Sequence, residues 1–253
     1  MRIFALSDLH VDYEANARWV RDLSRHDYQD DVLILAGDIT HRLPLLQLTL
    51  STLASCFEQV LFVPGNHDLW VFGEAGARTS LEKFEEVQAL AESCGVSTRT
   101  FNKHGWSIVP LLSWYDYSFG PPSDDLKQMW ADYRACRWPT GMGPAEATAH
   151  FLGLNRIEVP EGTAKIISFS HFLPRLDLVP FYVPAKHRML DPVLGSDLLE
   201  RQVRRIHPSI HVYGHSHINR SVRIDGIKYV NNAFGYPQEE MIASKKLLCI
   251  DET

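Results

Sequence analysis

The feature that most limits how this chain can fold is a recurrence: short apolar runs end in small clusters of Gly, Asp, Asn and His. Apolar runs of this length, bounded by turn-forming residues, predict buried β-strands. The predicted strands with such ends lie at residues 1–7, 32–36, 60–63, 164–169 and 210–213. Segments with helical periodicity separate the first strands, and this alternation favours a layered α/β fold.

Helical periodicity is clearest in two segments, where apolar residues recur at three- and four-residue steps over residues 46–57 and 84–94. The remaining strands are expected at 104–112, 221–224 and 228–230. The last two flank Asp225-Gly226, a dipeptide typical of tight hairpin turns. Because strands occur in both halves of the sequence, we expect two sheets packed face to face in a single domain, residues 1–253.

Composition excludes several classes of protein. A chain of 253 residues with 45% hydrophobic residues can bury a large core without disulfide bonds. Its net charge of −6 disfavours nucleic acid and anionic membranes as partners. No apolar run approaches the roughly 18–20 residues of a membrane span. The four cysteines are scattered and form no C-x-x-C pair, so we expect a reducing compartment, the cytoplasm.

The polar clusters carry the chemistry of the sequence. In an open α/β sheet, the carboxyl ends of the strands line one crevice, so the side chains that follow these strands are expected around one pocket. These side chains are Asp8, His10, Asp38, Asn66, His67, His171, His215 and His217. Carboxylate oxygens and imidazole nitrogens without a thiolate suit divalent Mn, Fe, Zn, Ni or Co. The sequence therefore predicts a metal site at the strand ends.

The order of the clusters also matches a family signature. The chain contains Asp8-Leu9-His10, Gly37-Asp38, Gly65-Asn66-His67-Asp68, an isolated His171, and Gly214-His215-Ser216-His217. It therefore resembles the calcineurin-like metallophosphoesterases, whose signature is D-x-H, G-D, G-N-H-[D/E], H and G-H-x-H. The resemblance implies an α/β fold, a four-layer αββα sandwich of two mixed sheets flanked by helices. It also implies a site for two divalent metal ions at the C-terminal ends of the strands.

The resemblance further implies a role for each motif residue. One metal would be held by Asp8, His10 and His217, and the other by Asn66, His171 and His215. Asp38 would bridge the two metals, along with a hydroxide. His67 is not needed as a ligand and is placed to protonate the leaving group as a general acid. Asp68 would hold the imidazole of His67 in the useful tautomer.

We therefore expect a hydrolase that cleaves a phosphodiester or a phosphomonoester of a small phosphorylated substrate, with nucleotides among the candidates. Two metals can activate a water and stabilise an in-line displacement at phosphorus. Two alternatives stay open. One is a nuclease of the same fold, which the net charge disfavours, and the other is a non-catalytic scaffold with structural metals. The oligomeric state is not indicated by the sequence.

Two segments do not fit the pattern of strands and helices, near residues 113–150 and 172–195, and we expect both to form lid or rim insertions. The first is dense in aromatic residues. Trp114 and Tyr115 follow a predicted strand directly and are candidates for a substrate rim, as is Arg220. The alternative is that the aromatic residues pack a small hydrophobic core of the lid itself.

Overall fold

The computed structural model describes residues 1–73 and 78–252, and its strands form two mixed sheets. The first sheet has four strands in the order β10-β1-β2-β3. Its members are β1 (Arg2–Leu6), β2 (Tyr28–Ala36), β3 (Phe57–Val63) and β10 (Leu248–Glu252). The first three run parallel, and β10 joins the edge of β1 in the antiparallel direction.

The second sheet has six strands in the order β4-β5-β6-β7-β9-β8. Its members are β4 (Phe101–Lys103), β5 (Trp106–Pro110), β6 (Lys165–Phe169), β7 (Ile210–Tyr213), β8 (Arg220–Ile224) and β9 (Ile227–Asn231). The four central strands are parallel, and β4 and β8 are antiparallel edges. Asp225 and Gly226 connect β8 to β9 with φ of 46° and 89°, as the predicted hairpin requires.

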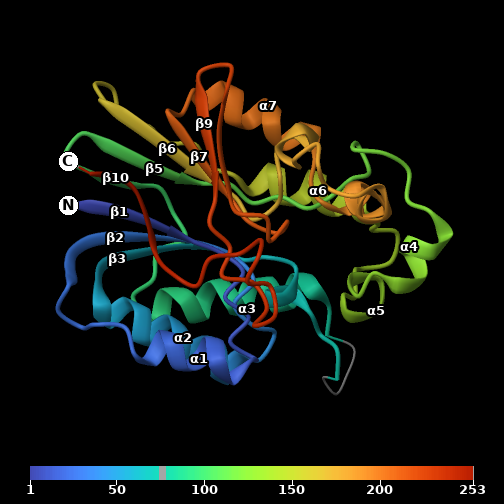
Figure 1. The fold of residues 1–253 in the computed structure, drawn as a ribbon, viewed down its shortest axis with the longest axis horizontal. Coiled ribbons are helices and arrows are strands. Elements are labelled where there is room, and N and C mark those ends of the chain that lie inside the picture. Colours follow the sequence, from blue (N-terminus) through green and yellow to red (C-terminus); the bar gives the residue numbers. More distant parts are fainter. Residues whose placement is uncertain (74–77, 253) are drawn as a thin grey trace.

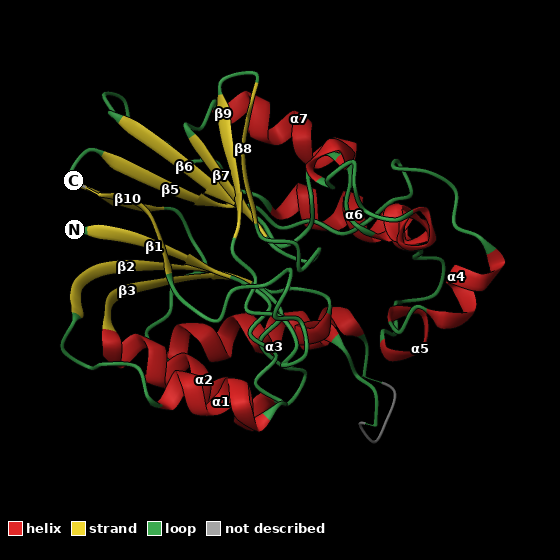
Figure 2. Ribbon diagram, in the orientation of Figure 1, coloured by secondary structure: helices red, strands yellow, loops and turns green. Residues whose placement is uncertain are grey.

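Helices cover the outer face of each sheet (Figures 1 and 2). The helices on the four-stranded sheet are α1 (Glu14–Arg21), α2 (Leu43–Cys56) and α3 (Ser80–Ser93), and those beyond the six-stranded sheet are α6 (Pro144–Leu154) and α7 (Asp197–Ile206). This arrangement confirms the predicted four-layer αββα sandwich. No helix in the described ranges is long and apolar enough to cross a membrane.

The two sheets share a core because the side chains of each strand alternate between its faces. In β2, Leu33 and Leu35 face the helices, whereas Val32 and Ile34 face the second sheet. The residues that the second sheet contributes to this inner layer include Ile108, Ile167, Ile210, Val212 and Val230. The near-continuous apolar run of β2 is thus buried on both faces, as is usual for parallel strands.

Two strand predictions needed correction. The segment 104–112 is not one strand, because His104 and Gly105, with φ of 50° and 78°, make the turn of a hairpin between β4 and β5. The C-terminal strand β10 was not predicted, since its short sequence has little apolar periodicity. Neither difference affects the strand ends that carry the polar clusters.

The insertion segments gather at the C-terminal ends of the parallel strands (Figure 1). Residues 113–150 contain α4 (Asp124–Met129), α5 (Asp132–Ala135) and the start of α6. Residues 172–195 contain two 3₁₀ helices, η2 (Leu176–Leu178) and η3 (Ala185–Val193). A further 3₁₀ helix, η1 (His67–Leu69), begins within the polar cluster that follows β3.

Candidate metal centre

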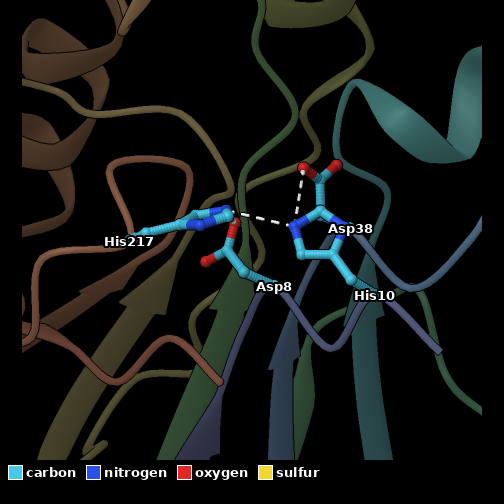
Figure 3. Close-up of side chains that lie close together, drawn as sticks. All are labelled: Asp8, His10, Asp38 and His217. Carbon is cyan, nitrogen blue, oxygen red and sulfur yellow. Dashed lines mark hydrogen bonds and ion pairs between the residues drawn. The ribbon is translucent and has the colours of Figure 1, made fainter. Parts of the chain in front are cut away.

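Two groups of buried side chains meet where the strands of both sheets end. Asp8, His10, Asp38 and His217 form one group, in which the potential ligand atoms all lie within 4.8 Å of one another. Asp38, His171 and His215 form the second group under the same limit. The residues come from the ends of β1, β2, β6 and β7, and Figure 3 shows how those of the first group turn toward one another. Asp38 belongs to both groups.

The loops that carry these residues hold an unusual backbone conformation. Asp8, His10, Asp38, His215 and His217 all have φ between 42° and 67°. Asp and His enter this left-handed region more readily than most residues, but each instance costs about 1–3 kcal/mol. The loops support one another through hydrogen bonds: the Asp8 amide donates to the Gly37 carbonyl at 2.9 Å, and the His10 amide to the Asp38 carbonyl at 3.0 Å. Five strained residues in one cluster are typical of a functional site.

Two of the three motif glycines, Gly37 and Gly65, are required by close packing against the candidate ligands. A Cβ on Gly37, whose φ is 81°, would lie 2.6 Å from Nδ1 of His171. A Cβ on Gly65 would collide with Oδ1 of Asp38. Both loops can therefore approach the ligands only because these positions carry no side chain.

The second group presents unprotonated ring nitrogens to one another. His171 donates from Nδ1 to the Ala36 carbonyl at 2.9 Å, and His215 donates from Nε2 to the Val193 carbonyl at 3.0 Å. The other nitrogens, Nε2 of His171 and Nδ1 of His215, then face each other at 3.1 Å with lone pairs exposed. Oδ1 of Asn66 lies 3.1 Å from the same Nε2 atom. Acceptor atoms converging in this way are suited to a cation.

The first group is arranged by a carboxylate that the sequence did not indicate. Nδ1 of His217 donates to Glu239 at 2.6 Å, so its Nε2 faces Oδ1 of Asp8 at 3.3 Å and Nε2 of His10 at 3.1 Å. Burial lowers the pKa of His217, but Asp8 and Glu239 outweigh this effect and raise the pKa to about 10. The same negative field would hold a metal cation at Nε2.

The carboxylates of Asp8 and Asp38 are buried, so their ionised forms require a positive charge nearby. Burial raises the pKa of Asp38 well above its usual range, and repulsion from Asp8 and Asp68 adds to the shift. Burial also raises the pKa of Asp8, but the facing His217 outweighs it and the net pKa falls. Carboxylate and imidazole donors without thiolates fit divalent transition metals. The residues present therefore fit two metal ions, with Asp38 between them.

His67 lies beside the metal ligands without joining either group. Its ring stacks on Trp70 with centroids 3.7 Å apart, and its edge meets the ring of His10 at 4.7 Å. Its backbone amide donates to Oδ1 of Asp38 at 2.9 Å. The His67 side chain is 18% exposed, whereas those of His10, Asp38 and His171 are almost fully buried. Burial, followed by repulsion from His10, lowers the pKa of His67 well below its ordinary value.

Asp68 has a different place from the one predicted. Its two oxygens accept hydrogen bonds from the backbone amides of Asp38, Ile39, Thr40 and Gly65, at 2.8–3.0 Å. Burial raises the pKa of Asp68 to about 6 even though these amides lower it. Asp68 therefore holds together the loops after β2 and β3, rather than orienting the imidazole of His67.

The expected substrate rim is also wrong for Trp114 and Tyr115. Trp114 and Tyr115 are only 1% and 2% exposed and belong to an apolar cluster with Phe151 and Phe172. Their aromatic surface is used in the core of the insertion, which is the alternative that the sequence left open. Arg220 donates from Nη1 to the carbonyls of Asp177 and Leu178 in η2, and its role as a rim residue stays a prediction.

Sequence comparison assigns the fold and the site to a known group. The family described as calcineurin-like phosphoesterase matches residues 1–219, a range that contains every candidate metal ligand. The chain belongs to the calcineurin-like phosphoesterases. These phosphoesterases use a dimetal site, and the chain is accordingly a hydrolase that cleaves phosphoesters in a metal-dependent way.

Individual members of the family show different degrees of likeness. Acyl-carrier-protein phosphodiesterase PptH of Mycobacterium tuberculosis is 26% identical over 266 residues, covering 94% of this chain and 78% of that protein. The crystal structure of phosphopantetheinyl hydrolase PptH from the same organism has a TM-score of 0.78 at 24% identity, covers 99% of this chain and 96% of that one, and shows the shared fold. The symmetrical bis(5′-nucleosyl)-tetraphosphatase of Aeromonas salmonicida is 37% identical over 76 residues, which are 30% of this chain and 28% of that protein.

Proposed function

We propose that this phosphoesterase is a phosphodiesterase that cleaves the diester linking a phosphopantetheinyl group to a carrier protein. The support is the likeness to acyl-carrier-protein phosphodiesterase PptH, which extends over 94% of this chain, insertions included. The likeness to the tetraphosphatase spans less than a third of either chain and supports no substrate. The proposal specifies the phosphorylated substrate expected from the sequence as a phosphodiester in which one of the two alcohols is a protein side chain.

The observation that carries the catalytic proposal is the convergence of acceptor atoms around Asp38. We propose that Asp8, His10 and His217 hold one divalent metal, that Asn66, His171 and His215 hold the other, and that Asp38 bridges them. The outer nitrogens of His171, His215 and His217 all donate to fixed acceptors, which leaves their inner nitrogens free to bind metal. The donor set suits Mn, Fe, Zn, Ni or Co, and metal analysis of the purified protein distinguishes these.

When bound, the metals supply a water of lowered pKa and positive charge for the non-bridging oxygens of the phosphoester. The position of His67 supports a role in protonating the leaving group. It is outside both ligand groups, yet it reaches solvent at the edge of the site. In the proposed step, an oxygen from water that has released one proton to solvent would bond to phosphorus as the bond from phosphorus to the alcohol oxygen breaks, and protonated His67 would donate its proton to that alcohol oxygen.

We further propose that residues 1–253 act as one catalytic domain in the cytoplasm, with 113–150 and 172–195 as its cap. Three features support this. The two sheets share one apolar core, the insertion helices gather beside the strand ends (Figure 1), and the four cysteines are unpaired.

The test is incubation of the Mn²⁺-loaded protein with a phosphopantetheinylated acyl carrier protein, followed by intact-mass measurement. The expected result is loss of one phosphopantetheinyl group, absent in a chelator blank and in Asp38→Ala. Bis(p-nitrophenyl) phosphate and p-nitrophenyl phosphate serve as parallel substrates, and the diester should be cleaved faster. An unchanged carrier protein together with faster monoester cleavage would refute the phosphodiesterase proposal and indicate a phosphatase.

A further inference from the structure

We propose that Asp132, in the 113–150 insertion, is a positioning residue that orients both Asn66 and, through Trp70, His67. The inference deepens the proposed function, because it rests on Asn66 as a metal ligand and His67 as the proton donor. It makes the insertion a working part of the site rather than only a cover. The carboxylate of Asp132 contacts Asn66 directly, and it acts on His67 through its hydrogen bond to Trp70.

Asp132 is 2% exposed and is surrounded by hydrogen-bond donors. Oδ1 accepts from Nδ2 of Asn66 at 2.9 Å and from Nε1 of Trp70 at 2.7 Å. Oδ2 accepts from Nε1 of Trp130 at 2.8 Å, and the hydroxyl of Tyr115 also bonds to the carboxylate. An indole nitrogen and a primary amide nitrogen are donors only. A side chain with two acceptor oxygens is therefore needed at this position.

The hydrogen bond between Asn66 and Asp132 determines which atom of the Asn66 amide faces the proposed metal. The carbonyl oxygen of the Asn66 amide can bind a cation, whereas its NH₂ group cannot. Because the NH₂ group donates to Asp132, Oδ1 is turned toward Nε2 of His171, 3.1 Å away. Without an acceptor at residue 132, the unprotonated Nε2 of His171 would favour the flipped orientation, in which the NH₂ group of Asn66 donates to it.

The orientation of the His67 ring depends on its contact with Trp70. Trp70 stacks on this ring with an interplanar angle of 28° and a centroid distance of 3.7 Å. The indole of Trp70 is fixed in its plane by the hydrogen bond to Asp132. The imidazole is thus held between Trp70 and His10, and its orientation depends on a residue 65 positions further along the chain.

The insertion is attached firmly enough to carry this role. The Val71 amide donates to the Ala135 carbonyl at 2.8 Å, and the Ser80 amide donates to the Arg137 carbonyl at 2.7 Å. These bonds tie α5 to the segment that follows η1 and to the first residue of α3. Asp132 therefore has a fixed position relative to the loop that carries Asn66 and His67.

The experiment compares Asp132→Leu, which has a side chain of similar size but no acceptor oxygen, with the matched control Asp31→Leu. Asp31 is also a buried carboxylate, but it bonds to Arg2 at the opposite end of the four-stranded sheet. Folding is checked by circular dichroism, and metal per chain is measured after equilibration with limiting Mn²⁺, with no substrate present. We expect Asp132→Leu to bind one of its two metals ~10–100-fold more weakly, whereas Asp31→Leu keeps both.

A rescue variant separates positioning from mere structural support. In Asn66→Asp/Asp132→Asn, the amide at 132 donates to a carboxylate at 66, which still offers an oxygen to the metal. We expect this double variant to regain the second metal. For the orientation of His67, the test is Trp70→Phe, which keeps a stacked ring but loses the hydrogen bond to Asp132. This variant should still bind two metals, and its kcat on an alkyl phosphodiester should fall while KM stays unchanged.

The proposal is overturned if folded Asp132→Leu binds both metals like the wild type, or if the double variant binds no more metal than Asp132→Leu does. If Asp132→Leu does not fold, the metal count of the double variant and the kcat of Trp70→Phe decide in the same way. A wild-type protein that binds two metals but leaves carrier protein intact would count against the proposed substrate alone.

Discussion

His67 differs from the other motif histidines in what its ring can reach. The rings of His171 and His215 are fixed by carbonyls and directed inward, whereas the ring of His67 is stacked on Trp70 and reaches solvent. A residue in this position can serve the leaving group without contributing to metal affinity. Its role is therefore separable from metal binding by substitution.

We predict that His67→Ala lowers kcat for an alkyl phosphodiester by ~10²–10⁴-fold, because an alkoxide leaves poorly without a proton. The loss for bis(p-nitrophenyl) phosphate should be much smaller, since p-nitrophenolate leaves unprotonated. Metal content should stay at the wild-type value. Steady-state kinetics with the two diesters measures the contrast, and exposed His26→Ala is the control. Equal losses on both substrates, or a parallel loss of metal, would contradict the assignment.

At the residue scale, the sequence indicated the candidate metal ligands but not the residues that form hydrogen bonds with them. The D-x-H, G-D, G-N-H-D and G-H-x-H clusters stand out because each follows a strand. Glu239 and Asp132 carry no such signal, because they reach the site through loops and a short helix whose paths depend on tertiary packing. The role predicted for Asp68 was wrong for a related reason: four backbone amides compete for its oxygens, and their positions are not visible in the sequence.

At the scale of elements, most strands with apolar runs were predictable, including the edge strands β3 and β8, whereas the edge strands β4 and β10 were not. The boundaries of β7 agree with the prediction. All four of its residues are buried, and its most polar side chain, His211, forms hydrogen bonds inside the core. Trp114 and Tyr115 show the opposite case. Aromatic density marked a segment that does not fit the pattern of strands and helices but could not tell a rim from a core, since both environments favour the same residues.

The centre of β7 also carries a pH-sensitive group outside the metal centre. His211 is fully buried between two hydroxyls, with Ser168 at 2.8 Å from Nδ1 and Ser170 at 3.1 Å from Nε2. Burial lowers the pKa of His211 to about 3. The unfolded chain binds a proton at this residue below about pH 6.5, whereas the folded chain does not until about pH 3. The folded state therefore loses stability as the pH falls through this window.

We predict that His211→Gln reduces the acid sensitivity of folding. The free energy of unfolding of the wild type should fall by about 2 kcal/mol more than that of the variant between pH 7 and pH 5. Urea unfolding at the two pH values, with chelator present in both, measures the difference. The metal-site histidines titrate in both proteins, so the comparison isolates His211. Identical changes with pH in the two proteins would show that His211 is not the source.

At the scale of the whole molecule, the metal centre joins the two sheets. The candidate ligands Asp8, His10 and Asp38 follow strands of the four-stranded sheet, and the candidate ligands His171, His215 and His217 follow strands of the six-stranded sheet. The loops also meet directly, since the His215 amide donates to Oδ1 of Asp8 at 3.1 Å. Metal bound here would connect loops from both sheets and neutralise Asp8 and Asp38, whose charges repel each other.

We therefore predict that removing metal lowers the melting temperature. A ligand that binds only the folded state at 100 times its Kd adds about 2.7 kcal/mol, which corresponds to roughly 5–10 °C for a chain of this size. Thermal unfolding with EDTA and with excess Mn²⁺, followed by circular dichroism, measures the shift. In Asp38→Asn the shift should almost disappear. The EDTA-treated variant should be at least as stable as the EDTA-treated wild type, because one of two repelling buried carboxylates is gone. A wild-type melting temperature that does not respond to EDTA would mean that the centre does not hold the two sheets together.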